Sequence, residues 1–109
     1  MSNWEDRLAL YDKLIATIPD LERKGKGVPY TSANGHMFSQ LNKEGEIGIR
    51  LPKEEFDAFM TKYDATPFTA YGATMKGYVT LPEALLKDVK KAKPYLKIAY
   101  DFVLSMKPK

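Results

Sequence analysis

His36 is the only histidine of this chain, so any acid–base or nucleophilic site would have to be built around it. A serine nucleophile needs a histidine base and is commonly presented by a Gly-x-Ser-x-Gly turn, which does not occur in the sequence. Cysteine is absent, which excludes thiol catalysis, disulfides and a zinc site of usual composition. The sequence therefore predicts no catalytic residue, no metal site and no cofactor, and a protein that is not an enzyme.

Two pairs of adjacent acids, Glu5–Asp6 and Glu54–Glu55, are the other candidates for acid–base chemistry. Both pairs fall in the first turn of a predicted helix, where the helix dipole favours negative charge. Dipole complementation accounts for these acids better than general acid–base catalysis does.

Ring-bearing and cationic side chains alternate along the predicted strands and form a candidate ligand or partner surface. If the alternation holds, they share the sheet face opposite the apolar residues: His36, Phe38, Gln40, Arg50, Lys76 and Tyr78. Sheets that carry rings beside cations bind single-stranded nucleic acid, although the RNA-recognition motif signature is not present. Arg50 and Lys76 equally suit a carboxylate or phosphate of a small ligand. Clustered exposed rings most often mark protein contacts, so we expect a protein partner or a second copy of the chain first.

Lysines concentrate near the C-terminus. The segment 87–109 has seven Lys against two Asp, whereas 1–86 has ten Lys and Arg against twelve Asp and Glu. The net charge of +3 therefore comes from the last part of the chain. Four of these lysines fall on broadly one side of a predicted helix and form a candidate basic patch: Lys87, Lys90, Lys91 and Lys97. Such a patch can meet phosphates or an acidic partner, but solvated lysines on an amphipathic helix are the commoner case.

The strands that must position these residues are predicted by alternation and turn residues. Asn34–Gly35 fits a tight turn with positive φ, between strands near 28–33 and 36–41. A third strand near 46–51 follows, and a second hairpin spans 67–81. The third strand has a clear phase, because its isoleucines alternate with polar residues. The second strand alternates less cleanly, and a one-residue slip would exchange its faces.

Proline positions and helical spacing predict the helices. The first helix should start near Ser2 or Asn3 and end at Pro19. Pro52 and Pro82 should open two further helices, since proline suits a first helical turn. Pro94 predicts a break or kink near 91–93 in the last helix, whose apolar stripe continues past it. The final residues, 107–109, should be frayed, because nothing apolar anchors them.

This order predicts a single α+β domain over residues 1–109. It should have two layers, an antiparallel sheet of about five strands and helices on one face. The composition, with 44% hydrophobic and 28% charged residues, is typical of a globular domain. An acidic N-terminus and the lack of a run of ~20 apolar residues argue against a secretory signal and a membrane span, so we expect a cytoplasmic protein.

Several segments resemble the N-terminal domain family of the competence regulator TfoX, also called Sxy. The resemblance covers nearly the whole chain and rests on these motifs: NGHMF at 34–38, IRLP at 49–52, the helix closing in Phe59 to Tyr63, the pair Tyr71–Gly72, and MKGYVTLPEALL at 75–86. It implies a two-layer α/β fold similar to secretion chaperones and no catalytic residues. The best-known relative regulates DNA-uptake genes but has a further C-terminal domain. A role in competence therefore does not transfer, and we expect a small interaction or regulatory module that self-associates.

Overall fold

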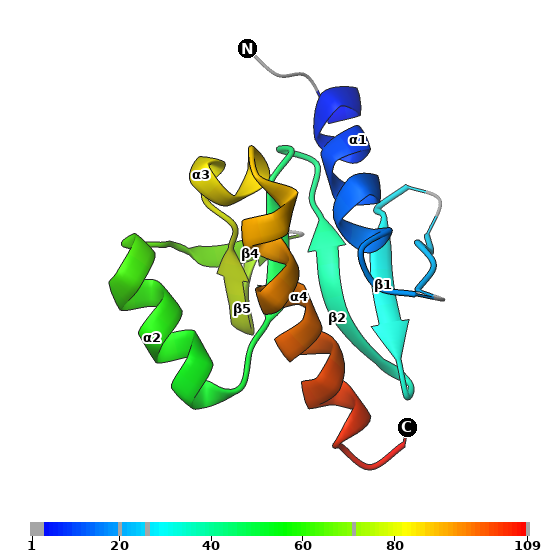
Figure 1. Cartoon of the computed structure of the whole chain (residues 1–109), viewed down its shortest axis with the longest axis vertical. Helices are drawn as coiled ribbons and strands as arrows, with labels where there is room; N and C mark the ends of the chain where they lie inside the picture. The colour runs from blue at the N-terminus through cyan, green and yellow to red at the C-terminus, as the bar shows by residue number, and fades with distance from the viewer. Residues whose placement is uncertain (1–3, 20, 26, 71, 109) are drawn as a thin grey trace.

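A computed structural model describes residues 4–19, 21–25, 27–70 and 72–108. Within these residues the elements follow the predicted order, an α+β arrangement of four helices and five strands (Figure 1). They are α1 (Trp4–Ile15), β1 (Tyr30–Ala33), β2 (His36–Leu41), β3 (Ile47–Arg50), α2 (Lys53–Tyr63), β4 (Pro67–Ala70), β5 (Ala73–Thr80), α3 (Glu83–Leu86) and α4 (Val89–Leu104). The predicted start of the first helix lies outside the described residues, and α1 ends four residues before Pro19.

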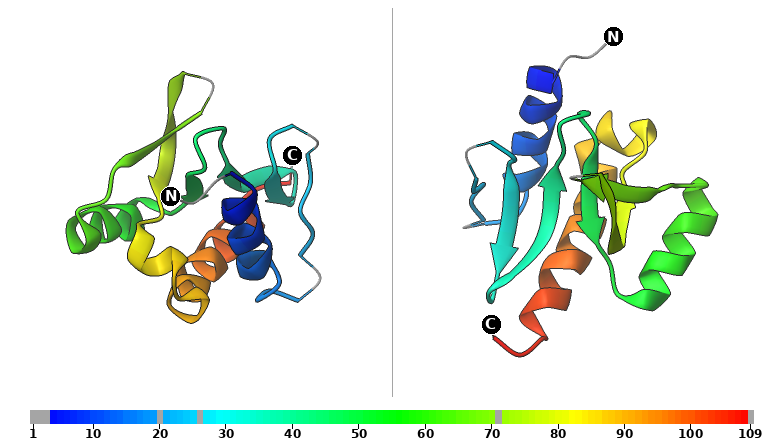
Figure 2. Two further views of the ribbon diagram at one scale, coloured as in Figure 1. Left: turned by 90° about the horizontal axis from the view of Figure 1, so that it is seen from above. Right: turned by 180° about the vertical axis from the view of Figure 1, so that it is seen from behind.

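The strands form one open antiparallel sheet in the order β1-β2-β3-β5-β4. The helices lie on one side of this sheet, and the β4–β5 hairpin projects on the other side (Figure 2, left). The two-layer arrangement is therefore as predicted. At the first turn, Asn34 and Gly35 have φ of 57° and 81°, which confirms the expected hairpin geometry.

The main core lies between the sheet and α1, α2 and α4. Ile47 and Ile49 of β3 are fully buried in it, so the predicted phase of this strand is correct. From α4, the residues at helical spacing face the same core: Ala92, Leu96, Ala99 and Val103. Among the described residues, no helix is long and apolar enough to span a bilayer.

A bulge in β2 changes the predicted faces of that strand. Thr31 pairs with Ser39, but the next residue of β1 pairs with Met37, so Phe38 is an extra residue. Both Ser39 and Phe38 consequently point to the helices: Ser39 Oγ lies 2.6 Å from the Tyr11 hydroxyl, and the Phe38 ring centroid lies 5.6 Å from that of Tyr100. The Phe38 side chain is fully buried. Its predicted place on an exposed polar face is therefore wrong.

His36 also leaves the predicted face and ties the end of the chain to the first hairpin. Its Nε2 donates to the Lys107 main-chain carbonyl at 2.8 Å. The Asn34 side-chain amide donates to the Val103 and Met106 carbonyls at 3.0 and 2.7 Å, at the end of α4. The Val103 carbonyl also accepts from the Met106 amide at 3.2 Å. Residues 107 and 108 are exposed and lie beyond α4, with Lys107 held by the hydrogen bond from His36, and Lys109 lies outside the described residues. The fraying of 107–109 stays a prediction.

The last helical region is divided, as predicted, but at a different place. The break falls at Lys87 and Asp88, between α3 and α4, and not near 91–93. Asp88 has non-helical φ of −134°, and its carboxylate accepts from the Lys90 amide at 3.1 Å, so it caps α4. Pro94 lies inside α4, where the buried apolar stripe offsets the backbone hydrogen bond that proline cannot make.

Candidate functional site

Arg50, Lys76 and Tyr78, three of the predicted surface residues, line one groove with a volume of about 860 Å³. The end of β3, the first turns of α2, the β4–β5 hairpin and the last turns of α4 surround it. Of these elements, α2, α4, β4 and β5 are labelled in Figure 1. The other lining side chains that matter for its chemistry are Lys53, Phe56, Asp57, Met75 and Phe102. We call this site the β5 groove.

Arg50 is the half-buried cation of the β5 groove. It is the last residue of β3, directly before the chain turns into α2. Its guanidinium carbon lies 5.4 Å from the centroid of the Phe102 ring, a cation–π arrangement. Within the described part of the chain, Arg50 has no ion pair or side-chain hydrogen bond. The Phe102 ring offers no hydrogen-bond acceptor oxygen, so the guanidinium N–H groups stay available for an anion.

Lys76 adds a second cation from β5. Its side chain is exposed, and within the described residues it also has no ion pair. Asp57 is the one acid among the described lining residues, and it pairs with Lys53 at 3.4 Å. The β5 groove therefore carries two positive charges that no neighbouring carboxylate neutralises.

Tyr78 forms a wall of the groove and is not a free stacking ring. Its side chain is 6% exposed, and its hydroxyl donates to the Met37 carbonyl at 2.8 Å. Burial raises the pKa of Tyr78 to about 12, although the Arg50 charge acts in the opposite direction. The prediction that this ring is open for stacking is therefore wrong.

We predict that Tyr78→Phe lowers the free energy of unfolding by about 1–2 kcal/mol at neutral pH, because the Met37 carbonyl loses its donor. The protonated phenol is favoured in the folded state, since its pKa rises from 10.0 to about 12. The stability that the Tyr78 phenol contributes to the folded state is complete below pH 10 and is lost as the pH rises towards 12. Urea denaturation of both proteins across this range measures the effect. If the unfolding free energies of the two proteins changed with pH in parallel, the stabilising role of the buried Tyr78 phenol would be contradicted.

The sheet face that was predicted to be polar carries a second, small apolar cluster. Phe68, Ala70 and Tyr78 are buried there, with Met37 and Met75 packed against them. Regular alternation would place Met75 on the same face as Val79, but Gly77 has φ of 83° and the pairing of β4 with β5 is irregular here. This distortion separates Met75 from the main core and places it in the groove lining. Gln40 is buried as well, at 2% exposure.

The four lysines of the predicted basic patch are all exposed, but they do not lie on one helix. Lys87 follows α3, whereas Lys90, Lys91 and Lys97 belong to α4 beyond the break. Lys97 is already paired with Asp101 at 2.8 Å. These lysines therefore lie on two separate helical segments and do not form a pocket.

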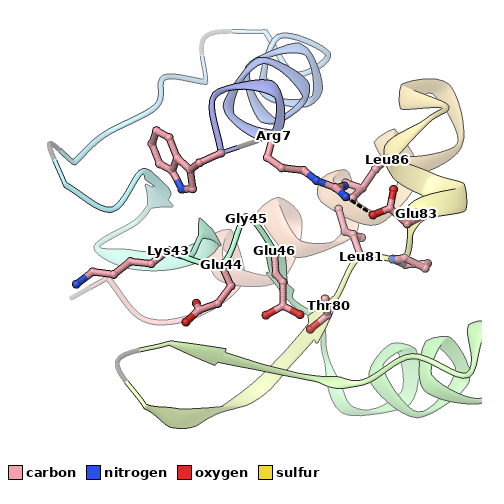
Figure 3. A pocket seen from close by; sticks show the side chains of 11 residues that line it. Arg7, Lys43, Glu44, Gly45, Glu46, Thr80, Leu81, Glu83 and Leu86 are labelled. Carbon is pink, nitrogen blue, oxygen red and sulfur yellow. Dashed lines mark hydrogen bonds and ion pairs between the residues drawn. The ribbon is translucent and has the colours of Figure 1, made fainter. Parts of the chain in front are cut away.

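A second cavity, of about 340 Å³, lies between α1, the β2–β3 turn and the start of α3 (Figure 3). An Arg7–Glu83 ion pair crosses it, and the Trp4 indole donates to the Asn42 carbonyl at 3.0 Å. Its charged side chains are mixed in sign, and the described residues contain no cluster of histidine and acids suited to a metal ion. We assign this cavity to the packing of α1 on the loops.

Comparisons with protein-family models, with curated proteins and with solved structures give no significant match to this chain. The function therefore has to be argued from the site itself.

Proposed function

We propose that this chain is a non-enzymatic interaction domain whose β5 groove binds a segment of a protein partner. The observation that carries the proposal is the combination of apolar side chains with two unneutralised cations in one open groove. Buried apolar contacts supply affinity, and a few placed charges fix orientation and specificity. The groove volume also lies within the range of roughly 300–1,000 Å³ that is usual for binding sites.

Two further observations support this proposal against the alternatives. His36, the only histidine, binds a main-chain carbonyl at the far hairpin and does not line the groove, which supports a role without acid–base catalysis. Nucleic acid is less favoured than the sequence suggested, because Phe38 and Tyr78 are buried and cannot stack on bases.

A small anion is the second candidate ligand, since Arg50 and Lys76 have no counter-charge among the described residues. An anion that binds the folded state raises its stability. Thermal unfolding with acetate or phosphate, at matched ionic strength with chloride, tests this candidate.

Self-association, a cytoplasmic location and membership of the TfoX N-terminal family stay predictions. The element order agrees with the two-layer fold that the resemblance implies. Leu104 is the one large hydrophobic side chain that is clearly exposed among the described residues, at 47%. Within the described part of the chain, exposed apolar side chains are therefore not gathered into a second large patch, and the two unneutralised cations of the groove favour a partner that brings opposite charge.

We expect random peptides displayed on phage to be enriched by this domain, and the enriched peptides to bind Phe56→Ala roughly tenfold more weakly than the unmodified domain. Phe56 is a half-buried ring of the groove wall, whereas Leu104 lies outside the groove and supplies the matched control Leu104→Ala. Absence of enrichment, or equal loss in both variants, would overturn the proposal. Light scattering on the same samples reports any dimer, and a dimer lost in Phe56→Ala alone would identify a second copy as the occupant.

A further inference from the structure

We infer that the partner segment is acidic, and that it enters the β5 groove with a carboxylate on Arg50 and Lys76 and an adjacent apolar side chain against Phe56, Met75 and Phe102. This inference rests on the proposed function, because it specifies the chemistry of the segment that the groove would bind.

Charge complementarity is the first argument. The described lining contains three cations and one acid, and Lys53 and Asp57 neutralise each other as an i,i+4 pair. The charges of Arg50 and Lys76 are left without a partner acid in the described lining. The two residues belong to different strands, β3 and β5, but line the same groove. Their uncompensated charge favours a partner that brings its own carboxylates, and it disfavours a basic segment.

The restricted position of the Arg50 side chain suits it to bind the carboxylate of the partner segment. This side chain is half-buried and lies over the Phe102 ring in a cation–π contact, which restricts its position before a ligand arrives. A planar guanidinium held in this way can donate two parallel hydrogen bonds to one carboxylate. Tyr78 is the ionisable neighbour that interacts electrostatically with Arg50. Its phenol stays protonated and neutral at neutral pH, because burial raises the pKa of Tyr78 to about 12. Tyr78 therefore does not compete with a ligand carboxylate for the Arg50 guanidinium.

The apolar lining makes a bare anion an incomplete ligand. Phe56 of α2, Met75 of β5 and Phe102 of α4 are all half-buried around the cations. They offer a contact surface for one aromatic or aliphatic side chain, and its burial would add affinity that a free carboxylate lacks. An acidic residue next to an apolar one satisfies both parts of the groove.

Selection of a random phage-displayed peptide library tests the inference, with the unmodified domain and the double variant Arg50→Gln/Lys76→Gln as parallel targets. We expect the first pool to be enriched in Asp and Glu beside apolar residues, and the second pool to lose the acidic preference. A first pool without excess acids, but still dependent on Phe56, would overturn the inference and leave the proposed function intact. No enrichment at all would overturn both.

Affinities of one enriched synthetic peptide then locate the contact. Arg50→Gln is expected to weaken binding roughly tenfold or more, the loss usual for a charge-assisted hydrogen bond. Lys53→Gln is the matched control, because it removes a charge at the same rim that is already paired with Asp57, and it should change affinity less than about twofold. Thermal unfolding of each variant verifies that it is folded.

The same peptide with Asn and Gln in place of its acids completes a double-mutant cycle. This amide peptide should bind the unmodified domain and Arg50→Gln equally, and binding of the acidic peptide should weaken as salt rises. Equal losses for Arg50→Gln and Lys53→Gln would mean general attraction by net charge, and would overturn the assignment of a carboxylate site at Arg50.

Discussion

Phe38→Ala is expected to lower the free energy of unfolding by about 3–5 kcal/mol, whereas Met37→Ala should cost less than about half as much. Phe38 is fully buried in the main core beside Tyr100, and its truncation leaves a cavity between β2 and α4. Met37 is only partly buried, in the smaller cluster on the other face. Urea denaturation monitored by circular dichroism measures both values.

This pair of substitutions also tests the bulge in β2. In a strand with regular alternation, Met37 would share the helical face with Ser39 and Leu41, and Phe38 would point away from the core. A larger loss for Met37→Ala than for Phe38→Ala would therefore show that the bulge is absent. Equal and small losses would contradict the burial of Phe38.

Gly48→Ala is expected to lower the free energy of unfolding by about 2–3 kcal/mol, close to the upper part of the range for overpacking. A methyl group at this position would lie closer than 3.0 Å to three ring atoms of Phe68, including the atom that joins the ring to its stem. The ring is fully buried by the second cluster and has little room to move. Thermal and urea unfolding measure the loss.

Two controls accompany Gly48→Ala. At Gly27 a methyl group would meet nothing within 4 Å, so Gly27→Ala should change stability by less than about 0.5 kcal/mol. Combining Gly48→Ala with Phe68→Leu should be less destabilising than the sum of the single changes, because the smaller side chain leaves space for the methyl group. Simple additivity of the two changes would contradict a direct clash.

The burial of Phe68 against Gly48 changes where binding is expected on this molecule. An open polar sheet would offer a flat platform, but here the β4–β5 hairpin projects from that side and covers part of the face (Figure 2, left). The accessible surface is instead a groove at the corner where β3 passes into α2. A groove of this kind favours a short inserted segment over a long stacked strand of nucleic acid.

Arg50 and Lys76 were grouped from sequence, and the structure shows that both line one groove, but their role as a binding site stays a prediction. Alternation along the predicted strands placed both on one face, and the structure brings both to one groove. The half-buried rings beside them were not predicted as part of the site. Phe56 belongs to an apolar helical stripe, which by itself predicts only core packing, and Phe102 approaches Arg50 solely through the fold.

The fold class, the order of the elements and the first hairpin could be predicted from the amino-acid sequence. These features depend on local backbone chemistry: Asn34 and Gly35 tolerate positive φ, proline suits the starts of α2 and α3, and β3 alternates without interruption. Such preferences act within a few residues, so they can be read along the chain.

The buried side of β2, the break in the last helical region and the composition of the β5 groove depend on long-range packing and were not predictable from the sequence. The bulge at Phe38 and the distortion at Gly77 are chosen by the packing of both sheet faces, since each moves a large apolar side chain into a cluster. Pro94 predicted a helix break near 91–93, but the buried stripe of α4 continues past it, and the break falls at Lys87 and Asp88. Contacts between residues far apart in the sequence determine these features, and no local sequence pattern predicts them.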